Sequence, residues 1–373
     1  MYRKVVYIVK SDLAYYPPCL SQIQMISDLG IDIEVWYGSS KQTAIDIMSE
    51  KGIPFIELVD LRGKYSGKLD VVSNWLAFRS AVVKRLHQLD KESTLLWFGT
   101  AESVMPLEGA LSGFHYVVSA LELYDDLPMK KALLGPLCRR AVACTACETA
   151  RAYIMKSWWD LESLPYVFPN KPYGMALRRE LPLSCDVTRR IIDELGGSDF
   201  VIYQGILQNE ESVAEIARAL KLLGGHYPLV LMGIDRNGMA PRIKKVYEGT
   251  RYYESIPAPK HLEITSRARF GVVFYDGANL NKAFCAPNKI YEYSSFGMPM
   301  LANDIPGLTN TVGAWGCAEC VKMESNSIAD ALTKMDADYD AYAKAATAFF
   351  EHTDNLSTMR HMLADLGVMR HGH

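Results

Sequence analysis

The chain has 373 residues, of which 49% are hydrophobic and 22% charged, and its formal net charge is −3. This length exceeds what one ordinary core needs and favours two domains of about 150–200 residues each. The small net charge argues against general nucleic-acid binding, which requires a clustered basic surface. No apolar run reaches the roughly 18 residues of a membrane span, and Met1 to Lys4 lead into a strand pattern without a signal peptide. We expect a cytoplasmic protein and leave peripheral membrane contact open.

Apolar runs alternate with helical patterns through the first half of the chain, which favours βα units and a mostly parallel sheet. The expected strands are residues 5–9, 33–37, 55–58, 94–98, 116–121 and 141–145. The expected helices are residues 20–29, 43–51 and 74–89. This order predicts a Rossmann-like first domain.

A Pro- and Gly-containing segment at 168–174 precedes the expected crossing between domains at 175–182. A second βα series follows, with strands expected at 200–204, 229–232 and 271–275 and a helix at 211–223. The tail from 339 to 366 has a helical pattern. We therefore assign 1–176 to an N-terminal domain, 177–350 to a C-terminal domain and 351–373 to a final helix.

The segment 286–300 carries the strongest functional signal. Asn288 is the expected N-cap of a helix that Gly297 ends, and a buried strand is expected at 298–302. Backbone N–H groups at such a helix start form a ready site for phosphate. Lys289 adds a positive charge there, and Glu292, one turn further on, can accept hydrogen bonds from a ribose diol. These are the parts needed to hold a nucleoside diphosphate.

The Pro-Asn-Lys-x-x-Glu-Tyr pattern at 287–293 resembles the nucleotide-binding element of GT-B glycosyltransferases, in the group 1 form frequent in bacterial cell-surface polysaccharide enzymes. The resemblance covers most of the chain, through the strand at 5–9, the sequence Tyr-Gln-Gly at 203–205 and this motif in order. It implies an α/β fold of the GT-B type, in which two Rossmann-like domains face each other across a cleft. It also implies a C-terminal helix that crosses back to the first domain, and a ribose contact by Glu292.

The chain departs from the family pattern at two places. Many retaining members carry a Glu-x7-Glu pair, and the position of the first Glu is Phe284 in this chain. Other members follow the glycine that corresponds to Gly205 with an Arg and a Lys, whereas this chain has Gln, Asn and Glu at 208–210. The phosphate role therefore shifts to Lys289 and the helix N-terminus, and the stereochemical outcome stays open.

Ligands of open α/β sheets bind at the carboxyl ends of the strands, which draws attention to glycines at those ends. Gly205 follows the first strand of the second domain and would let the backbone approach a diphosphate; the alternative is a plain turn glycine. Gly233 follows the next strand, and a role in ligand binding and a purely structural role in the turn explain this glycine equally well.

Two further loops of the second domain are candidates. The resemblance places the loop 255–262 at the nucleobase, where the backbone of Ile256 would read a uracil edge. The loop 275–282 is expected to shape the donor-sugar pocket, with Asn281 or Lys282 as contacts.

The first domain is expected to bind the acceptor. Tyr15 and Tyr16 follow the first strand and could stack on a sugar, unless they only cover the next helix. Glu102, in a similar loop, is a weaker candidate.

An inverting transfer needs a base for the acceptor hydroxyl. The acidic run after the strand at 116–121 offers Glu122 and Asp125 as the catalytic candidates, and capping or solvation accounts for at least one acid of the run, which also contains Asp126. A retaining enzyme would rely on donor phosphate and backbone groups. Glu148 and Arg151 are most simply a pair at a helix N-terminus.

Two Cys-x-x-Cys pairs, Cys144/Cys147 and Cys317/Cys320, raise the alternative of a zinc site. Their wide separation and the apolar strand around the first pair favour free, buried thiols.

We interpret the chain as a hexosyltransferase-type glycosyltransferase without an obligatory metal or other cofactor. It would use a nucleotide-sugar donor, with UDP expected, and a glycan or lipid-linked acceptor in polysaccharide biosynthesis. The alternatives are a nucleotide-sugar 2-epimerase and a non-catalytic scaffold that binds nucleotide sugar.

Overall fold

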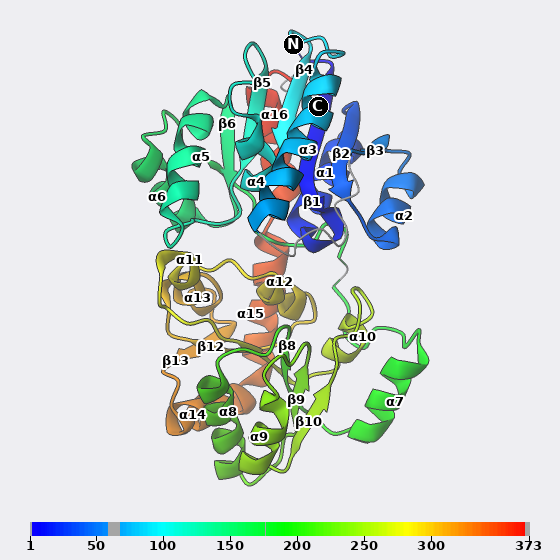
Figure 1. The fold of residues 1–373 in the computed structure, drawn as a ribbon. Coiled ribbons are helices and arrows are strands. Elements are labelled where there is room, and N and C mark those ends of the chain that lie inside the picture. The colour runs from blue at the N-terminus through cyan, green and yellow to red at the C-terminus, as the bar shows by residue number, and fades with distance from the viewer. Residues whose placement is uncertain (1, 59–67, 176, 370–373) are drawn as a thin grey trace. The chain divides into compact units, whose positions relative to one another are not determined.

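The computed structural model describes residues 2–58, 68–175 and 177–369, and the chain divides into two compact units (Figure 1). Unit 1 contains Met1–Tyr173 and Asp354–His373, and unit 2 contains Gly174–Thr353. Ala176, the last residue assigned to the N-terminal domain from the sequence, lies outside the described residues, as do 370–373 of the expected final helix.

Unit 1 is built on a parallel sheet. In its described residues seven strands pair in the order β3-β2-β1-β4-β5-β6-β7. The strands are β1 (Lys4–Asp12), β2 (Ile33–Ser39), β3 (Phe55–Glu57), β4 (Thr94–Phe98), β5 (His115–Ser119), β6 (Ala143–Ala146) and β7 (Tyr166–Val167). The helices are α1 (Pro17–Asp28), α2 (Gln42–Glu50), α3 (Lys68–Leu86), α4 (Ala101–Val104), α5 (Pro128–Arg140), α6 (Thr149–Trp159) and α16 (Asn355–Asp365).

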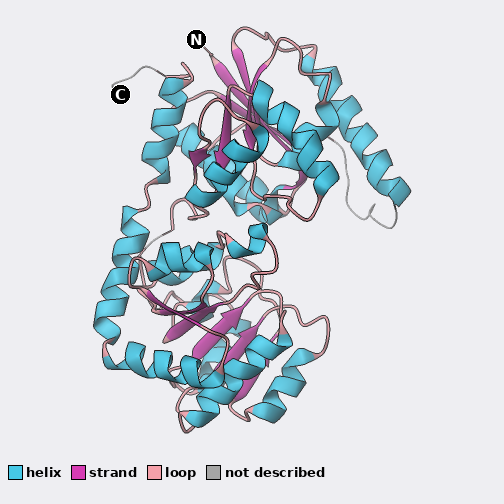
Figure 2. Cartoon of the chain, turned by 90° about the vertical axis from the view of Figure 1, so that its left-hand side faces the viewer, coloured by secondary structure: helices cyan, strands magenta, loops and turns pink. Residues whose placement is uncertain are grey.

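Each face of this sheet carries its own apolar core, because side chains alternate along a strand. On β1, Val6 and Ile8 belong to the core shared with α3, α5 and α6. Val5, Tyr7 and Val9 belong to the other core, which α1, α2 and α16 complete. Figure 2 shows the strands enclosed between helices. A strand that is buried on both faces reads as a continuous apolar run, which is why β1 was predictable.

The last helix of the chain, α16, belongs to unit 1, as the sequence predicts. Met359, Met362 and Leu363 are fully buried in the core with α1. The Asn355 amide donates to the Pro169 carbonyl over 2.7 Å, and the Tyr166 hydroxyl donates to Asp365 over 2.7 Å. Apolar burial and polar contacts at both ends of the helix therefore fix it to the sheet that the N-terminal half of the chain forms.

Unit 2 repeats the architecture. Six strands in its described part pair in parallel in the order β10-β9-β8-β11-β12-β13. They are β8 (Val201–Gln204), β9 (Leu229–Met232), β10 (Thr250–Tyr253), β11 (Phe270–Val273), β12 (Met300–Asn303) and β13 (Ala318–Val321). The helices are α7 (Asp186–Leu195), α8 (Glu210–Leu222), α9 (Met239–Val246), α10 (Leu262–Thr265), α11 (Leu280–Ala283), α12 (Asn288–Ser295), α13 (Pro306–Leu308), α14 (Ser325–Ala337) and α15 (Tyr339–His352).

The helical tail predicted at 339–366 consists of two helices, α15 and α16. Asp354 interrupts the pattern, and its carboxylate accepts from the Ser357 backbone N–H over 2.9 Å, which caps the start of α16. The break lies where the chain passes from unit 2 to unit 1.

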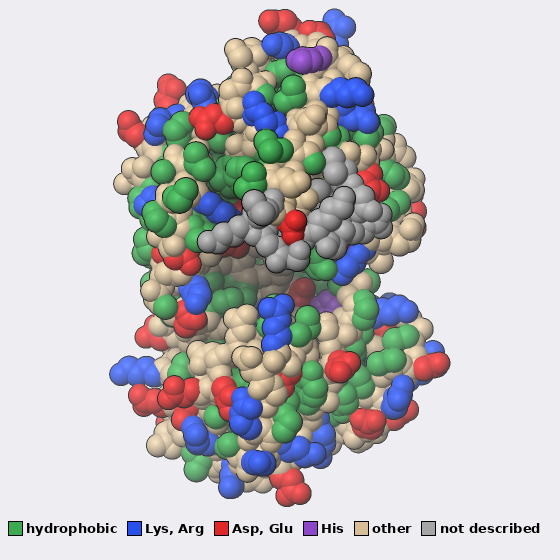
Figure 3. Space-filling view, viewed as in Figure 1, with side chains coloured by type: hydrophobic (Ala, Val, Ile, Leu, Met, Phe, Trp, Pro, Cys, Tyr) green, Lys and Arg blue, Asp and Glu red, His purple; other side chains and the backbone are tan. Residues whose placement is uncertain are grey.

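Acidic and basic side chains are interspersed over the visible surface of unit 2 (Figure 3). In the described ranges, no helix combines the length and apolar character needed to cross a bilayer.

The docking of α16 predicts a large effect of truncating its central side chain. Leu363→Ala should lower the free energy of unfolding by about 2–5 kcal/mol, because it leaves a cavity in the core of unit 1. Arg360→Ala, at an exposed position of the same helix, should change it by less than about 0.5 kcal/mol. Urea denaturation followed by circular dichroism measures both, and equal stabilities would contradict the packing described for α16.

Candidate functional site

The strand order of unit 2 reverses between β8 and β11, which is the position where open parallel sheets bind ligands. Gly205 follows β8 with φ +112°, and Gly233 follows β9 with φ +155°. A Cβ on Gly233 would lie 1.6 Å from the Gly205 carbonyl oxygen. Both glycines are therefore required by backbone geometry: one permits the close approach of the two turns, and the other adopts a conformation that L side chains rarely take.

Helix α12 begins beside this pair of turns. It starts at Asn288, one residue earlier than the sequence indicates, so Pro287 and not Asn288 is the N-cap residue, and no side chain caps the helix. Proline suits this position because it has no N–H to satisfy. Gly297, with φ +56°, follows the helix end as predicted.

Lys289 extends from the first turn of α12 toward Gly205. Its Nζ lies 3.5 Å from the point that a Gly205 Cβ would occupy, 4.9 Å from the centre of the Tyr203 ring and 5.6 Å from that of Tyr275. Burial lowers the pKa of Lys289 to about 8, although the charges of Glu292 and Cys285 oppose the change. The structure thus holds a partly desolvated cation against a bare stretch of backbone, as a bound anion requires.

Glu292 lies one turn further along α12, and its side chain is 15% exposed. The Gln204 amide donates to its Oε2, and Nε2 of His261 lies 3.8 Å from the same oxygen. The Thr265 hydroxyl in turn donates to Oε1 of Gln204 over 2.6 Å. The sequence analysis did not single out Gln204, Thr265 or His261 as site residues, although Gln204 lies inside the Tyr-Gln-Gly pattern and His261 inside the candidate loop 255–262.

The remaining candidates of unit 2 lie on neighbouring loops. Ile256 is partly buried after β10 and packs on the core beside the segment that leads into α10. Asn281 is on the four-residue helix α11. The adjacent Lys282 forms an ion pair with Asp276 at 2.8 Å on the surface. The structure therefore brings Gly205, Lys289 and Glu292 together, while Ile256 and Asn281 come from separate loops.

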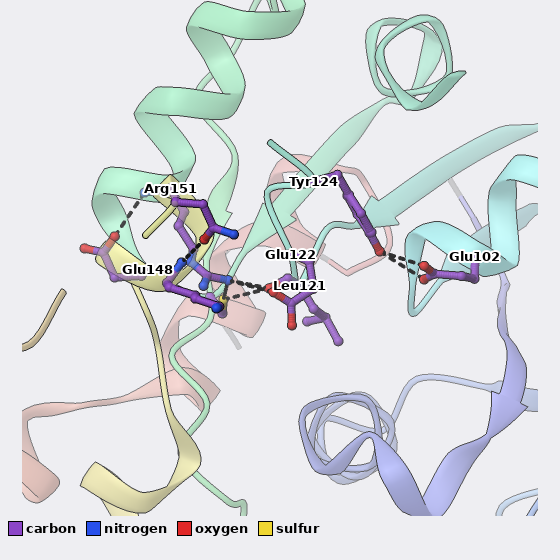
Figure 4. Close-up of polar contacts among 9 residues, drawn as sticks. Glu102, Leu121, Glu122, Tyr124, Glu148 and Arg151 are labelled. Atoms are coloured by element: carbon purple, nitrogen blue, oxygen red, sulfur yellow. Dashed lines mark hydrogen bonds and ion pairs between the residues drawn. The ribbon is translucent and has the colours of Figure 1, made fainter. Parts of the chain in front are cut away.

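The strand order of unit 1 reverses between β1 and β4, and a second polar cluster lies near the carboxyl ends of these strands (Figure 4). The Tyr124 hydroxyl is 3.0 Å from each carboxylate oxygen of Glu102, and Lys130 Nζ is 3.1 Å from Oε1. Tyr124 has φ +59°, a left-handed conformation that is strained for an aromatic residue. Burial raises the pKa of Tyr124, and the negative charge of Glu102 raises it further.

Glu122 points away from that cluster and toward Arg151 (Figure 4). Its side chain is 51% exposed, and its Oε2 lies 3.8 Å from Nη1 of Arg151, which is itself only 5% exposed. The same Nη1 donates to the Leu121 carbonyl over 2.6 Å. Glu148 caps α6 by accepting from the backbone N–H of Arg151 over 3.0 Å, in line with the structural reading of that pair. Asp125 is partly exposed in the following turn.

The loop after β1 holds the expected acceptor contacts. Tyr15 is 68% exposed, with Lys41 Nζ 4.6 Å from its ring centre. Tyr16 is partly buried at the start of α1 and packs on the core. Lys10, which sequence reasoning did not single out, is buried at the end of β1; burial lowers its pKa, and the charge of Glu102 opposes that change.

In the part of the chain that the structure describes, all eight cysteines are free thiols. Across the same residues, no group of three or more His, Cys, Asp or Glu side chains is arranged to hold a metal ion.

No protein-family model and no curated protein matches the chain in sequence. Solved structures do match over the full length. HepE of Anabaena, in complex with UDP and glucose, has a TM-score of 0.69 at 13% identity and covers 99% of this chain and 100% of its own. The α,α-trehalose 6-phosphate synthase of Burkholderia multivorans has a TM-score of 0.70 at 13% identity, covering 98% and 96%. The chain has the GT-B fold.

A Listeria monocytogenes protein assigned as a UDP-N-acetylglucosamine 2-epimerase matches this GT-B chain equally well, with a TM-score of 0.70, 11% identity and coverage of 98% and 96%. The GT-B fold is therefore shared by proteins of different activities. At these identities the likeness establishes the fold, and function has to be argued from the residues of the site.

The buried position of Lys289 predicts a stability gain on its removal. The folded-state pKa of about 8 lies below that of an unfolded lysine, so the charged form is penalised in the fold at every pH below 8. Lys289→Met should raise the free energy of unfolding at pH 7 by about 1–2 kcal/mol, less than the full pKa change implies because the side chain is partly exposed. The gain should shrink as pH rises from 8 toward about 10.4.

Urea denaturation at pH 7 and pH 9.5 measures this difference. Lys282→Met is the matched control, since that lysine is exposed and paired with Asp276, and it should give no gain. A loss of stability in Lys289→Met at pH 7 would show that the ammonium is not penalised by its surroundings.

Proposed function

We propose that the protein is a glycosyltransferase that binds a nucleotide-diphosphate sugar, with UDP as the nucleotide, in unit 2. The observation that carries this proposal is the convergence of Gly205, Lys289 and Glu292 at the point where the sheet order reverses. A bare backbone turn, a partly desolvated cation and a carboxylate one helical turn away match the diphosphate and ribose of one ligand.

Each part of the donor is assigned to a different group. Lys289 and the uncapped backbone N–H groups of α12, from Asn288 onward, would meet the diphosphate charge and stabilise the departing nucleotide. Glu292 would accept hydrogen bonds from the ribose hydroxyls. The backbone of Ile256 would read the base, and Asn281 would contact the donor sugar. With the charge met in this way, we propose that no metal ion is obligatory.

We propose that unit 1 binds the acceptor. This acceptor would be a glycan or a lipid-linked glycan used in the biosynthesis of bacterial cell-surface polysaccharides. Tyr15, with its exposed ring, and Tyr16 would contact the acceptor sugar. Glu122 or Asp125 would take the proton of the attacking hydroxyl in an inverting reaction. The exposed carboxylate of Glu122 suits this role, because a base must reach its substrate. Cytoplasmic location, with peripheral membrane contact, belongs to the same proposal.

The structural neighbours support a uracil nucleotide, since HepE was solved with UDP and glucose. They also keep a second candidate, a nucleotide-sugar 2-epimerase, because a Listeria protein assigned to that class shares the fold. One observation favours the epimerase: the imidazole of His261 lies beside Glu292 and could act as an acid–base group near the proposed donor site.

Nucleotide binding tests the donor site directly. UDP at 100 times its dissociation constant should stabilise the protein by about 2.7 kcal/mol, a visible rise of the thermal midpoint. Glu292→Ala should weaken UDP binding about tenfold to a hundredfold, because it removes charge-assisted hydrogen bonds to the ribose. Glu211→Ala, at an exposed position of α8, should leave binding unchanged. An equal response of wild type and Glu292→Ala to UDP would refute the assignment of Glu292.

Product analysis distinguishes the candidate reactions. Incubation with UDP-sugars and glycan acceptors should give a glycoside and free UDP, whereas an epimerase would return an epimerised donor and a scaffold would return the donor unchanged. Transfer should persist in excess EDTA. Loss of activity in EDTA that only Mg²⁺ or Mn²⁺ restores would overturn the proposal of metal independence.

A further inference from the structure

A chain of hydrogen bonds leads to Glu292 from α10 and β8. The Thr265 hydroxyl donates to Oε1 of Gln204 over 2.6 Å, and the Gln204 amide nitrogen donates to Oε2 of Glu292. Thr265 is fully buried and Gln204 is 5% exposed. The three residues come from α10, β8 and α12, so the contact depends on the tertiary fold of unit 2.

The direction of this chain decides how the Gln204 amide lies. A glutamine amide offers hydrogens on one side and a carbonyl oxygen on the other. Because the Thr265 hydroxyl donates to the carbonyl, the hydrogens face the Glu292 carboxylate. In the reverse orientation two oxygens would face each other, and burial makes such an unpaired contact costly. The hydroxyl also lies 3.1 Å from the His261 carbonyl, which is the longer of its two contacts.

The hydrogen bonds from Thr265 through Gln204 also determine which oxygen of Glu292 is available to a ligand. Gln204 and His261 both approach Oε2. Both of these contacts are to Oε2, and neither is to Oε1. A carboxylate held through one oxygen presents the other in a defined direction, which lowers the entropic cost of binding a ligand that needs that geometry.

We propose that Thr265 and Gln204 are positioning residues for recognition of the nucleotide's ribose diol: they orient Glu292 so that its carboxylate accepts from the 2′- and 3′-hydroxyls. Neither residue touches the ligand in this arrangement. The inference rests on the proposed function, since it assumes that Glu292 binds ribose.

The test pairs protein variants with two ligands, UDP and 2′,3′-dideoxy-UDP, in calorimetric titrations. The wild-type protein should bind UDP at least about tenfold more tightly, because only UDP carries the diol. Thr265→Val keeps the shape of the side chain and removes its hydroxyl. It should weaken UDP binding about tenfold, leave dideoxy-UDP binding nearly unchanged and so abolish the preference. Thr265→Ser keeps the hydroxyl and should restore it.

The outcomes separate this inference from the proposed function. If wild type prefers UDP and Glu292→Ala abolishes the preference but Thr265→Val retains it, the positioning role is wrong and the donor site stands. If wild type binds neither ligand, or binds both equally, the ribose contact itself is wrong. If Thr265→Val does not fold, Gln204→Met is measured with the same ligands; an equal loss for both ligands overturns the inference, and a loss confined to UDP supports it.

Discussion

The close approach of two backbone turns is the constraint on which the rest of the proposed donor site depends. The turn after β9 lies so near the turn after β8 that a Cβ on Gly233 would collide with the Gly205 carbonyl at 1.6 Å. Gly205 faces Lys289: a Cβ built on Gly205 would lie 3.5 Å from the Lys289 Nζ. Gly233 lets the two turns approach each other, and the Lys289 ammonium lies against the backbone of the first turn, at the reversal point of the sheet.

Placing a lysine there costs stability that the free protein does not recover. Burial lowers its pKa to about 8, and the neighbouring charge of Glu292 compensates only in part. A diphosphate would supply the missing negative charge and return the pKa of Lys289 toward its ordinary value. A residue whose charge is penalised by burial and would be stabilised by an anion is a candidate for a binding site, because local consistency tends to be broken at functional positions.

Local pattern predicted what depends on local sequence. Strands β4 and β9 have the bounds that their residue patterns predict. The grouping of Gly205, Lys289 and Glu292 came from the resemblance of 203–205 and 287–293 to the GT-B nucleotide-binding element. The Thr265–Gln204–Glu292 chain was not predictable, because its contacts span 61 and 88 residues. It depends on α10 lying beside the end of β8, and periodicity carries no information about that placement. The exact position of the break, at Asp354, was not predicted, because a helical pattern continues across it.

In unit 1 the acidic run after β5 shows how backbone conformation divides neighbouring side chains. The left-handed turn at Tyr124 directs its phenol to Glu102, while Glu122, two residues earlier, faces Arg151. The reversal points of the two sheets hold different chemistry: unit 2 offers a cation beside bare backbone, and unit 1 offers carboxylates, a phenol and ammonium groups. The first is consistent with the proposed anionic donor, and the second with the hydroxyl groups of the proposed sugar acceptor.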